Sequence, residues 1–233
     1  MESRPMAPTK VQLVGITYPK LDNVNSAEEL VAYVARVSNP SNQLNKETSA
    51  GLIKYLIKHQ HWSPFEMVNV VLEIETTRDI ARQILRHRSF SFQEFSQRYA
   101  DPTKDLSLVT REARYQDTKN RQNSVELDWS QDRDRQIAYQ WENLQNTLID
   151  TVNDMYKWAT DHGIAKEQAR AVLPEGLTRS RMYMNGTLRS WIHYVQLRSA
   201  HGTQKEHIEV ANLCAEVLRK EFPNIVQFAN EAT

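Results

Sequence analysis

The sequence has very little cysteine: Cys214 is the only one among its 233 residues. A single thiol excludes an intramolecular disulfide and a four-cysteine zinc site, and it suits the reducing cytosol, so we expect a cytoplasmic location. Cys214 lies in the run Ala-Asn-Leu-Cys-Ala-Glu-Val-Leu, which is typical of a helix and contains no basic side chain that would lower the pKa of the thiol. We interpret Cys214 as a core residue that the activity does not need.

The sequence also lacks an excess of either charge, because 29 lysines and arginines balance 29 aspartates and glutamates. A nucleic-acid polymer is not an expected partner, since such polymers are held mainly by excess positive charge. No apolar run is long enough to span a membrane, and residues 1–12 lack the apolar core of a signal peptide. We therefore expect no membrane partner, and we expect residues 1–12 to form a short disordered lead-in.

Glycine is scarce, with six residues, and no Gly-x-Gly-x-x-Gly motif is present. A dinucleotide held at the glycine-rich turn of a doubly wound sheet is thereby excluded. No internal repeat and no low-complexity tract divides the chain. At this length we expect one domain that covers residues 1–233.

Apolar residues that alternate along the chain predict strands, and apolar residues at helical spacing predict helices. Strands are predicted at 11–17, 68–75 and 178–184, and helices at 26–37, 46–59, 77–88, 134–161, 165–172, 187–198 and 204–220. The fold class is therefore α+β, a small, mostly antiparallel sheet packed against several helices that include one long helix.

The segment 101–135 is polar and poor in periodic apolar residues, which indicates a long loop or insertion. A lid over the substrates, an interface element and a disordered insertion are all compatible with it. The long helix that follows carries one apolar stripe, made of Ile137, Trp141, Leu144, Leu148, Val152 and Met155.

The chain concentrates positive charge in one short segment. Between positions 78 and 98 five arginines accompany only two acids, and residues 86–99 read RHRSFSFQEFSQRY. In a helix over 77–88, Arg78, Arg82 and Arg86 would form one cationic ridge, while Ile80, Ile84 and Leu85 would face inward. A purely structural alternative is that Arg86, His87 and Arg88 only stabilise the helix by lying at the negative end of its dipole. That alternative requires neither Ser96 nor Arg98, so we expect a small anionic ligand.

Two further segments contain residues that suit a binding site. Residues 59–66 read HQHWSPFE, in which a metal site and a polar turn are alternatives to ligand binding; no third metal ligand follows at a suitable spacing. In a helix over 187–198, an apolar face opposes a face with Arg189, His193 and Gln196. Arg198 borders the apolar face beside Trp191 and needs a partner, which an internal salt bridge or a snorkelling side chain would also satisfy.

Together these segments resemble the flavin-dependent thymidylate synthases, in which Arg-His-Arg, seven residues and Ser recur as a unit. The likeness includes HQHWSPFE and the stretch from Arg170 through Leu173-Pro174 to Arg198, Gln204 and Glu206. It implies conversion of dUMP to dTMP, with methylenetetrahydrofolate as carbon donor and NADPH-reduced FAD as hydride carrier. It also implies a homotetramer whose active sites are shared between chains.

The resemblance assigns roles to individual residues, with Arg198, Ser96 and Arg86 at the chemistry and no metal. The implied dUMP contacts are Gln83, Arg86, Glu94, Ser96, Gln97, Arg98, Arg170 and Arg198. The implied FAD contacts are His61, Ser63, Glu66, Arg86, His87, Arg88, Thr187, Arg189 and His193. Gln93 stands where many members have Asn, and it retains the amide chemistry of that residue. Ser96 has no evident His and acid relay, so we assign it to dUMP binding and polarisation.

Two rival functions remain at the level of sequence. A non-catalytic nucleotide-binding or regulatory protein could use the arginine clusters for a phosphorylated ligand. A small RNA-binding module could use arginine and phenylalanine for stacking on bases. The balanced charge argues against the second rival, and the three linked segments argue against the first.

Overall fold

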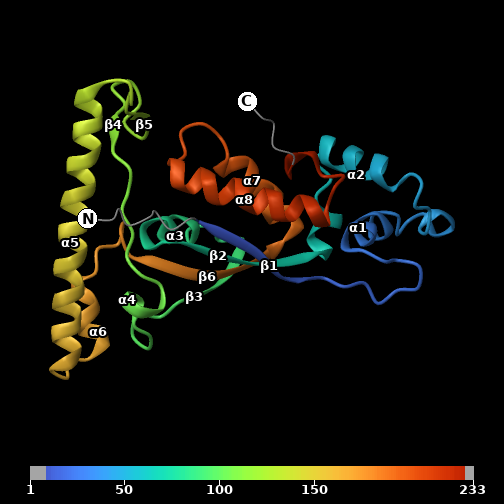
Figure 1. The fold of residues 1–233 in the computed structure, drawn as a ribbon. Coiled ribbons are helices and arrows are strands. Elements are labelled where there is room, and N and C mark those ends of the chain that lie inside the picture. The colour runs from blue at the N-terminus through green and yellow to red at the C-terminus, as the bar shows by residue number, and fades with distance from the viewer. Residues whose placement is uncertain (1–8, 229–233) are drawn as a thin grey trace.

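The structure is a computed structural model that describes residues 9–228, and it confirms the predicted α+β class (Figure 1). Its main sheet has the strand order β1-β2-β6-β3, with each neighbouring pair antiparallel. The strands are β1 (Lys10–Ile16), β2 (Asn69–Thr77), β3 (Phe90–Glu94) and β6 (Arg179–Thr187). The helices are α1 (Ala27–Ala35), α2 (Ser49–Lys58), α3 (Arg78–Ile84), α4 (Pro102–Asp105), α5 (Asp132–Asp161), α6 (Lys166–Ala169), α7 (Leu188–Arg198) and α8 (Lys205–Glu221).

The sheet buries one face because its strands alternate apolar and polar residues. Along β2, Val70, Leu72 and Ile74 are fully buried, and Met184 and Met182 of β6 pair with the last two. Helices α7 and α8 lie across this face (Figure 1). The predicted apolar face of α7 is confirmed, since Leu188, Trp191, Ile192 and Val195 are all buried.

The indole of Trp191 ties α7 to the sheet. Its Nε1 donates a 3.1 Å hydrogen bond to the carbonyl oxygen of Val70, so the ring is buried without an unsatisfied donor. Burying a large apolar side chain of this kind contributes roughly 1.5 to 3 kcal/mol. This packing fixes the position of α7, and with it the side chains along the exposed face of that helix.

Three predictions around the cationic segment need correction. Helix α3 ends at Ile84, so Arg86 lies in the following turn and does not extend a ridge with Arg78 and Arg82. Residues Phe90–Glu94, which are not among the predicted strands, form the edge strand β3. Strand β6 continues to Thr187, three residues beyond the predicted end. Sheet pairing explains the last two differences, because β3 pairs with β6 from Phe90 and Gly186 onward.

The polar segment is ordered rather than structureless. It contains α4 and a hairpin of β4 (Arg114–Gln116) and β5 (Ser124–Glu126). Asp117 stabilises the turn of the hairpin, because its carboxylate accepts the backbone N–H groups of Lys119 and Asn120. The hairpin lies beside the beginning of α5, at one end of the molecule (Figure 1).

Helix α5 forms as predicted, but its apolar stripe is largely exposed. Trp141, Leu144, Leu148 and Met155 are between 43% and 59% exposed, whereas the buried face consists of Gln145, Ile149, Val152, Tyr156 and Ala159. Helical spacing grouped these exposed side chains correctly, but it also assigned Val152 to the stripe, and Val152 lies on the buried face. It did not show that most of the stripe would lie outside the core of the chain.

Smaller predictions have mixed outcomes. The helix predicted from residue 26 begins at Ala27, because Ser26 caps α1 by accepting the N–H of Glu29. Of the lead-in expected at residues 1–12, residues 1–8 lie outside the described part, and Lys10 already begins β1. Within residues 9–228, no helix combines the length and the apolar character that a membrane span requires.

Candidate active site

The Arg-His-Arg segment is a tight turn between α3 and β3. The N–H of His87 donates to the carbonyl oxygen of Ile84 at 3.0 Å, which turns the chain back toward the sheet. Phe90 then packs on Gly186, where a Cβ atom would lie only 2.4 Å from the ring. A glycine at position 186 is therefore needed to let the turn approach β6 so closely.

The three side chains of this turn differ in their surroundings. Arg86 and Arg88 are exposed, and neither makes a side-chain hydrogen bond or ion pair with any residue in the range 9–228. His87 is half-buried, and the Nε of Arg198 donates to its Nε2 at 2.9 Å. Its ring stands edge-on to Tyr194, with ring centroids 5.0 Å apart. The sequence indicated that Arg198 needs a partner, and that partner is a neutral imidazole rather than an acid.

His87 is uncharged at neutral pH for two reasons. Burial lowers its pKa to about 4, and the nearby Arg198 guanidinium adds to the effect. An arginine Nε can only donate, so Nε2 of His87 must accept and its proton must sit on Nδ1. The turn therefore presents two free guanidiniums and one neutral imidazole.

Gln83 lies near this turn, on the last turn of α3. Its Nε2 donates to the Oε1 of Gln204 at 2.8 Å, and its Oε1 lies 3.3 Å from the Nδ1 of His207. The Nε2 of His207 is 3.1 Å from the hydroxyl of Tyr194. The ring of Tyr194 also stands edge-on to the ring of His87. Gln83 and Arg198, both predicted dUMP contacts, are thus joined through one buried aromatic cluster.

A second group surrounds Glu94, at the end of β3. Its carboxylate is 3.6 Å from Arg78 and 3.3 Å from Arg82, and it accepts the hydroxyl of Ser180 at 2.8 Å. Glu94 is thereby fixed in place by partners within the chain. The sequence pattern predicted Arg78 as part of a cationic ridge and not as a partner of Glu94; its side chain is buried.

The remaining predicted dUMP contacts lie after β3 and near α6. Arg98 and Arg170 are both exposed and both contact Glu167, Arg98 through its carboxylate at 3.5 Å and Arg170 through its carbonyl oxygen at 3.3 Å. The hydroxyl of Ser96 accepts the N–H of Arg98 at 3.4 Å. Gln97 is 5% exposed, and its amide nitrogen has no hydrogen-bond partner. A buried amide without a partner is costly unless a ligand satisfies it.

The predicted FAD contacts form a third group, along the exposed side of α7. Arg189 forms an ion pair with Glu66, and the ring of His193 packs edge-on to Trp62 at 4.6 Å. Thr187 caps α7 by accepting the N–H of Ser190 at 3.3 Å. His61 and Ser63 are exposed on the neighbouring turn. The hydroxyl of Ser190 also donates to the carbonyl oxygen of Ser89 at 3.3 Å, which connects this group to the Arg86–Arg88 turn.

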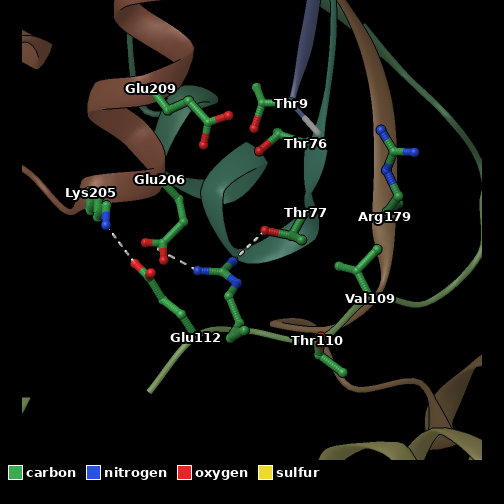
Figure 2. A pocket seen from close by; sticks show the side chains of 11 residues that line it. Thr9, Thr76, Thr77, Val109, Thr110, Glu112, Arg179, Lys205, Glu206 and Glu209 are labelled. Atoms are coloured by element: carbon green, nitrogen blue, oxygen red, sulfur yellow. Dashed lines mark hydrogen bonds and ion pairs between the residues drawn. The ribbon is translucent and has the colours of Figure 1, made fainter. Parts of the chain in front are cut away.

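Within residues 9–228 no hydrogen bond or ion pair joins Arg86 to Ser96. The pocket of Figure 2, with a volume of about 120 Å³, contains none of the predicted site residues. Its polar lining includes Arg111 and Glu206, with Glu206 and Glu209 extending from α8 and Thr77 from β2 (Figure 2). Glu206 belongs to the stretch that carries the family resemblance. Arg111 lies in the polar segment 101–135, where no motif or periodic pattern indicates a functional residue.

Comparisons with known proteins show the family of the chain. The family described as thymidylate synthase complementing protein matches residues 20–224. A probable flavin-dependent thymidylate synthase of Paramecium bursaria Chlorella virus 1 is 49% identical over 216 residues, which cover 93% of this chain and 96% of that protein. The flavin-dependent thymidylate synthase of Synechocystis sp. (strain ATCC 27184 / PCC 6803 / Kazusa) is 44% identical over 218 residues, covering 92% of this chain and 96% of that one.

Among solved structures, the UMP/dUMP methylase PolB from Streptomyces cacaoi, bound with 5-Br dUMP, superimposes with a TM-score of 0.74 and 25% identity. The superposition covers 94% of this chain and 93% of PolB. The long, highly identical matches and the shared fold agree with the Arg86 to Ser96 motif: the chain belongs to the flavin-dependent thymidylate synthase family.

Proposed function

We propose that the residues around Arg86, Arg198 and Ser96 form the active site with which this chain carries out the reaction of its family. That reaction makes dTMP from dUMP with methylenetetrahydrofolate and reduced FAD. The observation that carries the proposal is the Arg86–Arg88 turn, in which two free guanidiniums flank a neutral histidine held by Arg198. Guanidiniums without acidic partners are suited to bind phosphate groups.

The polar side chains along α7 and in the Arg86–Arg88 turn fit FAD. Arg86 and Arg88 offer free donors for its pyrophosphate, and His87 can donate from Nδ1. Further polar contacts along α7 and the neighbouring turn come from Thr187, Arg189, His193, His61, Ser63 and Glu66. FAD, once reduced, supplies the hydride that no side chain can provide. NADPH is the proposed source of that reducing power.

The residues after β3 fit dUMP. Arg98 and Arg170 provide exposed guanidiniums for the phosphate, with the Ser96 hydroxyl nearby in sequence. The unpartnered amide nitrogen of Gln97 is a donor that a carbonyl or phosphate oxygen would satisfy. Gln83 and Glu94 supply an amide and a carboxylate for the polar edge of the uracil ring.

Arg198 is the residue that we place at the reacting ring. Its Nε is engaged by His87, and neither of its Nη groups bonds to a residue in the range 9–228. This fixed, partly free guanidinium can therefore stabilise the negative charge that develops on a carbonyl oxygen of the uracil when its C5 carbon becomes nucleophilic. Arg86 and Ser96 orient dUMP beside it.

We further propose that the active chain is a single domain that assembles as a homotetramer in the cytoplasm. Two observations support shared sites: the free guanidiniums of Arg86 and Arg88, and the exposed apolar stripe of α5. Contiguous exposed apolar side chains commonly mark a protein interface. The partner chain would then bring its own residues to the Arg86–Arg88 turn.

The decisive experiment is a binding and turnover assay on purified protein. We expect the preparation to show the visible absorption of oxidised flavin, NADPH to bleach it, and dTMP to form only when dUMP and methylenetetrahydrofolate are both present. Arg86→Ala should lower turnover by roughly two orders of magnitude, since charged contacts in a desolvated site contribute a few kcal/mol. A colourless protein that takes up no added FAD would contradict the proposal.

A further inference from the structure

A continuous series of hydrogen bonds connects the pocket of Figure 2 to Gln83. It starts at Glu206, in the first turn of α8, whose side chain is 17% exposed. One carboxylate oxygen pairs with Arg114, and the other lies 3.2 Å from Arg111, an ion pair drawn as a dashed line in Figure 2. The second oxygen also accepts the Nε2 of Gln204 at 2.9 Å.

Arg111 holds Glu206 from a rigid position. Its guanidinium also donates to Asp79 at 2.7 Å and to the hydroxyl of Thr77, which join it to the start of α3. Its backbone is fixed to α5, because the buried amide of Gln145 accepts its N–H at 2.8 Å and donates to its carbonyl oxygen at 2.9 Å. Glu206 therefore lies between two arginines and stays ionised: burial opposes ionisation, but Arg111 and its other partners hold its pKa below the ordinary value.

The ionised carboxylate gives the series one direction. Glu206 can only accept, so Gln204 must point its amide nitrogen at Glu206 and its amide oxygen at Gln83. That oxygen can only accept, so Gln83 must present its own Nε2 to Gln204, 2.8 Å away. The amide oxygen of Gln83 is then left facing the Nδ1 of His207.

His207 completes the series with a single tautomer. The side chain is fully buried, and burial together with Arg198 and His87 lowers its pKa to about 3, so the ring is neutral. The amide oxygen of Gln83 requires the proton of His207 on Nδ1, which leaves Nε2 to accept the Tyr194 hydroxyl at 3.1 Å. A reversed Gln83 would point its amide oxygen at that of Gln204 and its amide nitrogen at the Nδ1–H of His207, so neither contact would be a hydrogen bond.

We propose that Glu206, held by Arg111 and Arg114, is a positioning residue that fixes the amide orientation of Gln83 and thereby the hydrogen-bonding pattern offered to the substrate. The inference rests on the proposed function, in which Gln83 contacts dUMP. Glu206 acts through Gln204 and needs no contact of its own with dUMP or FAD.

The first test compares Glu206→Gln with Glu209→Gln, a matched control on the next turn of α8 in the same pocket. Both variants are loaded with FAD, and dUMP binding is measured by calorimetry. We expect the dissociation constant of dUMP to rise about tenfold or more in Glu206→Gln and to stay within about twofold in the control, with FAD content unchanged in both. Unchanged dUMP affinity in Glu206→Gln overturns the proposal.

A reciprocal exchange tests direction rather than mere stability. In Glu206→Gln combined with Gln204→Glu, residue 204 becomes the obligatory acceptor for Gln83, so the orientation of Gln83 is restored. We expect the double variant to recover most of the lost dUMP affinity. If the double variant binds dUMP as weakly as Glu206→Gln does, the proposal is overturned, because the carboxylate introduced at position 204 presents an acceptor to Gln83 as in the native chain.

The tautomer of His207 gives a readout that is independent of substrate. In protein labelled with ¹⁵N-histidine, and assigned with His207→Gln, we expect a proton on Nδ1 in the native chain and a mixture of tautomers in Glu206→Gln. A native proton on Nε2 overturns the proposal. Should Glu206→Gln not fold, Gln204→Leu interrupts the same series without removing an ion pair, and we expect it to weaken dUMP binding by the same factor; native affinity overturns the proposal.

Gln83→Leu separates this inference from the proposed function. If that variant binds dUMP as tightly as the native chain, Gln83 does not contact the substrate and its proposed role is wrong, while the His207 tautomers still decide whether Glu206 orients it. If Gln83→Leu weakens binding and Glu206→Gln does not, Gln83 contacts dUMP and the positioning role of Glu206 is wrong.

Discussion

The Nε of Arg198 donates to the Nε2 of His87 at 2.9 Å, which ties the end of α7 to the turn between α3 and β3. Because arginine is always protonated and His87 must accept, the pair carries one charge rather than two. The cation on α7 is therefore not neutralised by an acid, and its remaining N–H groups stay available to a ligand. This arrangement suits a residue that stabilises charge on a substrate.

Arg198→Ala should lower the rate of dTMP formation by roughly 100-fold to 1,000-fold, as loss of one donor to a developing oxyanion does in other enzymes. Arg219→Ala is the matched control, since Arg219 is an exposed arginine in the last turn of α8. Turnover is measured at saturating dUMP, with circular dichroism and flavin content as checks of folding. An effect below about tenfold would contradict the assignment of Arg198 to the reacting ring.

Sequence patterns predicted the parts of this site that lie on regular elements. The buried face of α7 followed from helical spacing, and the unsatisfied position of Arg198 beside Trp191 correctly indicated a partner. Strand β3 was missed although Phe90 and Phe92 alternate with polar residues, because a five-residue edge strand gives little signal without its partner β6.

Two features depended on tertiary contacts that no local pattern records. Arg111 lies in a polar segment, and it gains its position only because α3, α5 and α8 meet around it. The stripe of α5 was visible as a pattern, but periodicity cannot tell whether an apolar face meets its own chain or another one. The same limit applies to Arg86 and Ser96, because the active site to which we assign both residues is proposed to form between chains.

The stability of the fold should fall as pH drops from about 6.5 toward 5. His87 and His207 have folded-state pKa values of about 4 and about 3, below the ordinary value of 6.5, so the unfolded chain binds their protons first. Their contribution is present above pH 6.5 and is lost progressively as pH falls toward the two folded-state pKa values, by up to about 1.4 kcal/mol per pH unit for each histidine. Urea unfolding at a series of pH values measures this slope.

His207→Gln should flatten that slope, since one of the two contributing groups is removed. His162→Gln is the control, because His162 is exposed at the end of α5. Equal slopes for the native chain and His207→Gln between pH 6.5 and 5 would show that His207 is not held neutral by burial.

Ser96→Ala should weaken dUMP binding by about tenfold without abolishing flavin binding, because a hydroxyl contact to a charged group contributes on the order of 1.5 kcal/mol. Ser96 has no histidine in hydrogen-bond contact within the described residues, so it lacks the base that a serine nucleophile needs. Calorimetry gives the affinity, and mass spectrometry of quenched reactions detects covalent species. Native dUMP affinity together with a new trapped covalent intermediate would overturn the binding role.

The exposed stripe of α5 predicts how the assembly can be disrupted. Leu144 and Leu148 are 59% and 45% exposed, so Leu144→Glu with Leu148→Glu adds charge to the stripe without disturbing the core. We expect a smaller particle by light scattering, with reduced flavin content and native helical circular dichroism. Asn143→Glu, an exposed position off the stripe, is the control. A native particle size in the double variant would place the interface elsewhere.

Cys214→Ala should keep turnover and flavin binding. The thiol is completely buried on α8, and burial raises its pKa, so it is protonated and unreactive at neutral pH. Replacing it leaves a small cavity and should lower the free energy of unfolding by about 1 kcal/mol, measured by urea denaturation. The reaction needs no cysteine nucleophile if hydride comes from reduced FAD and dUMP is held by arginines. Loss of all turnover in a folded, flavin-loaded Cys214→Ala protein would contradict this division of roles.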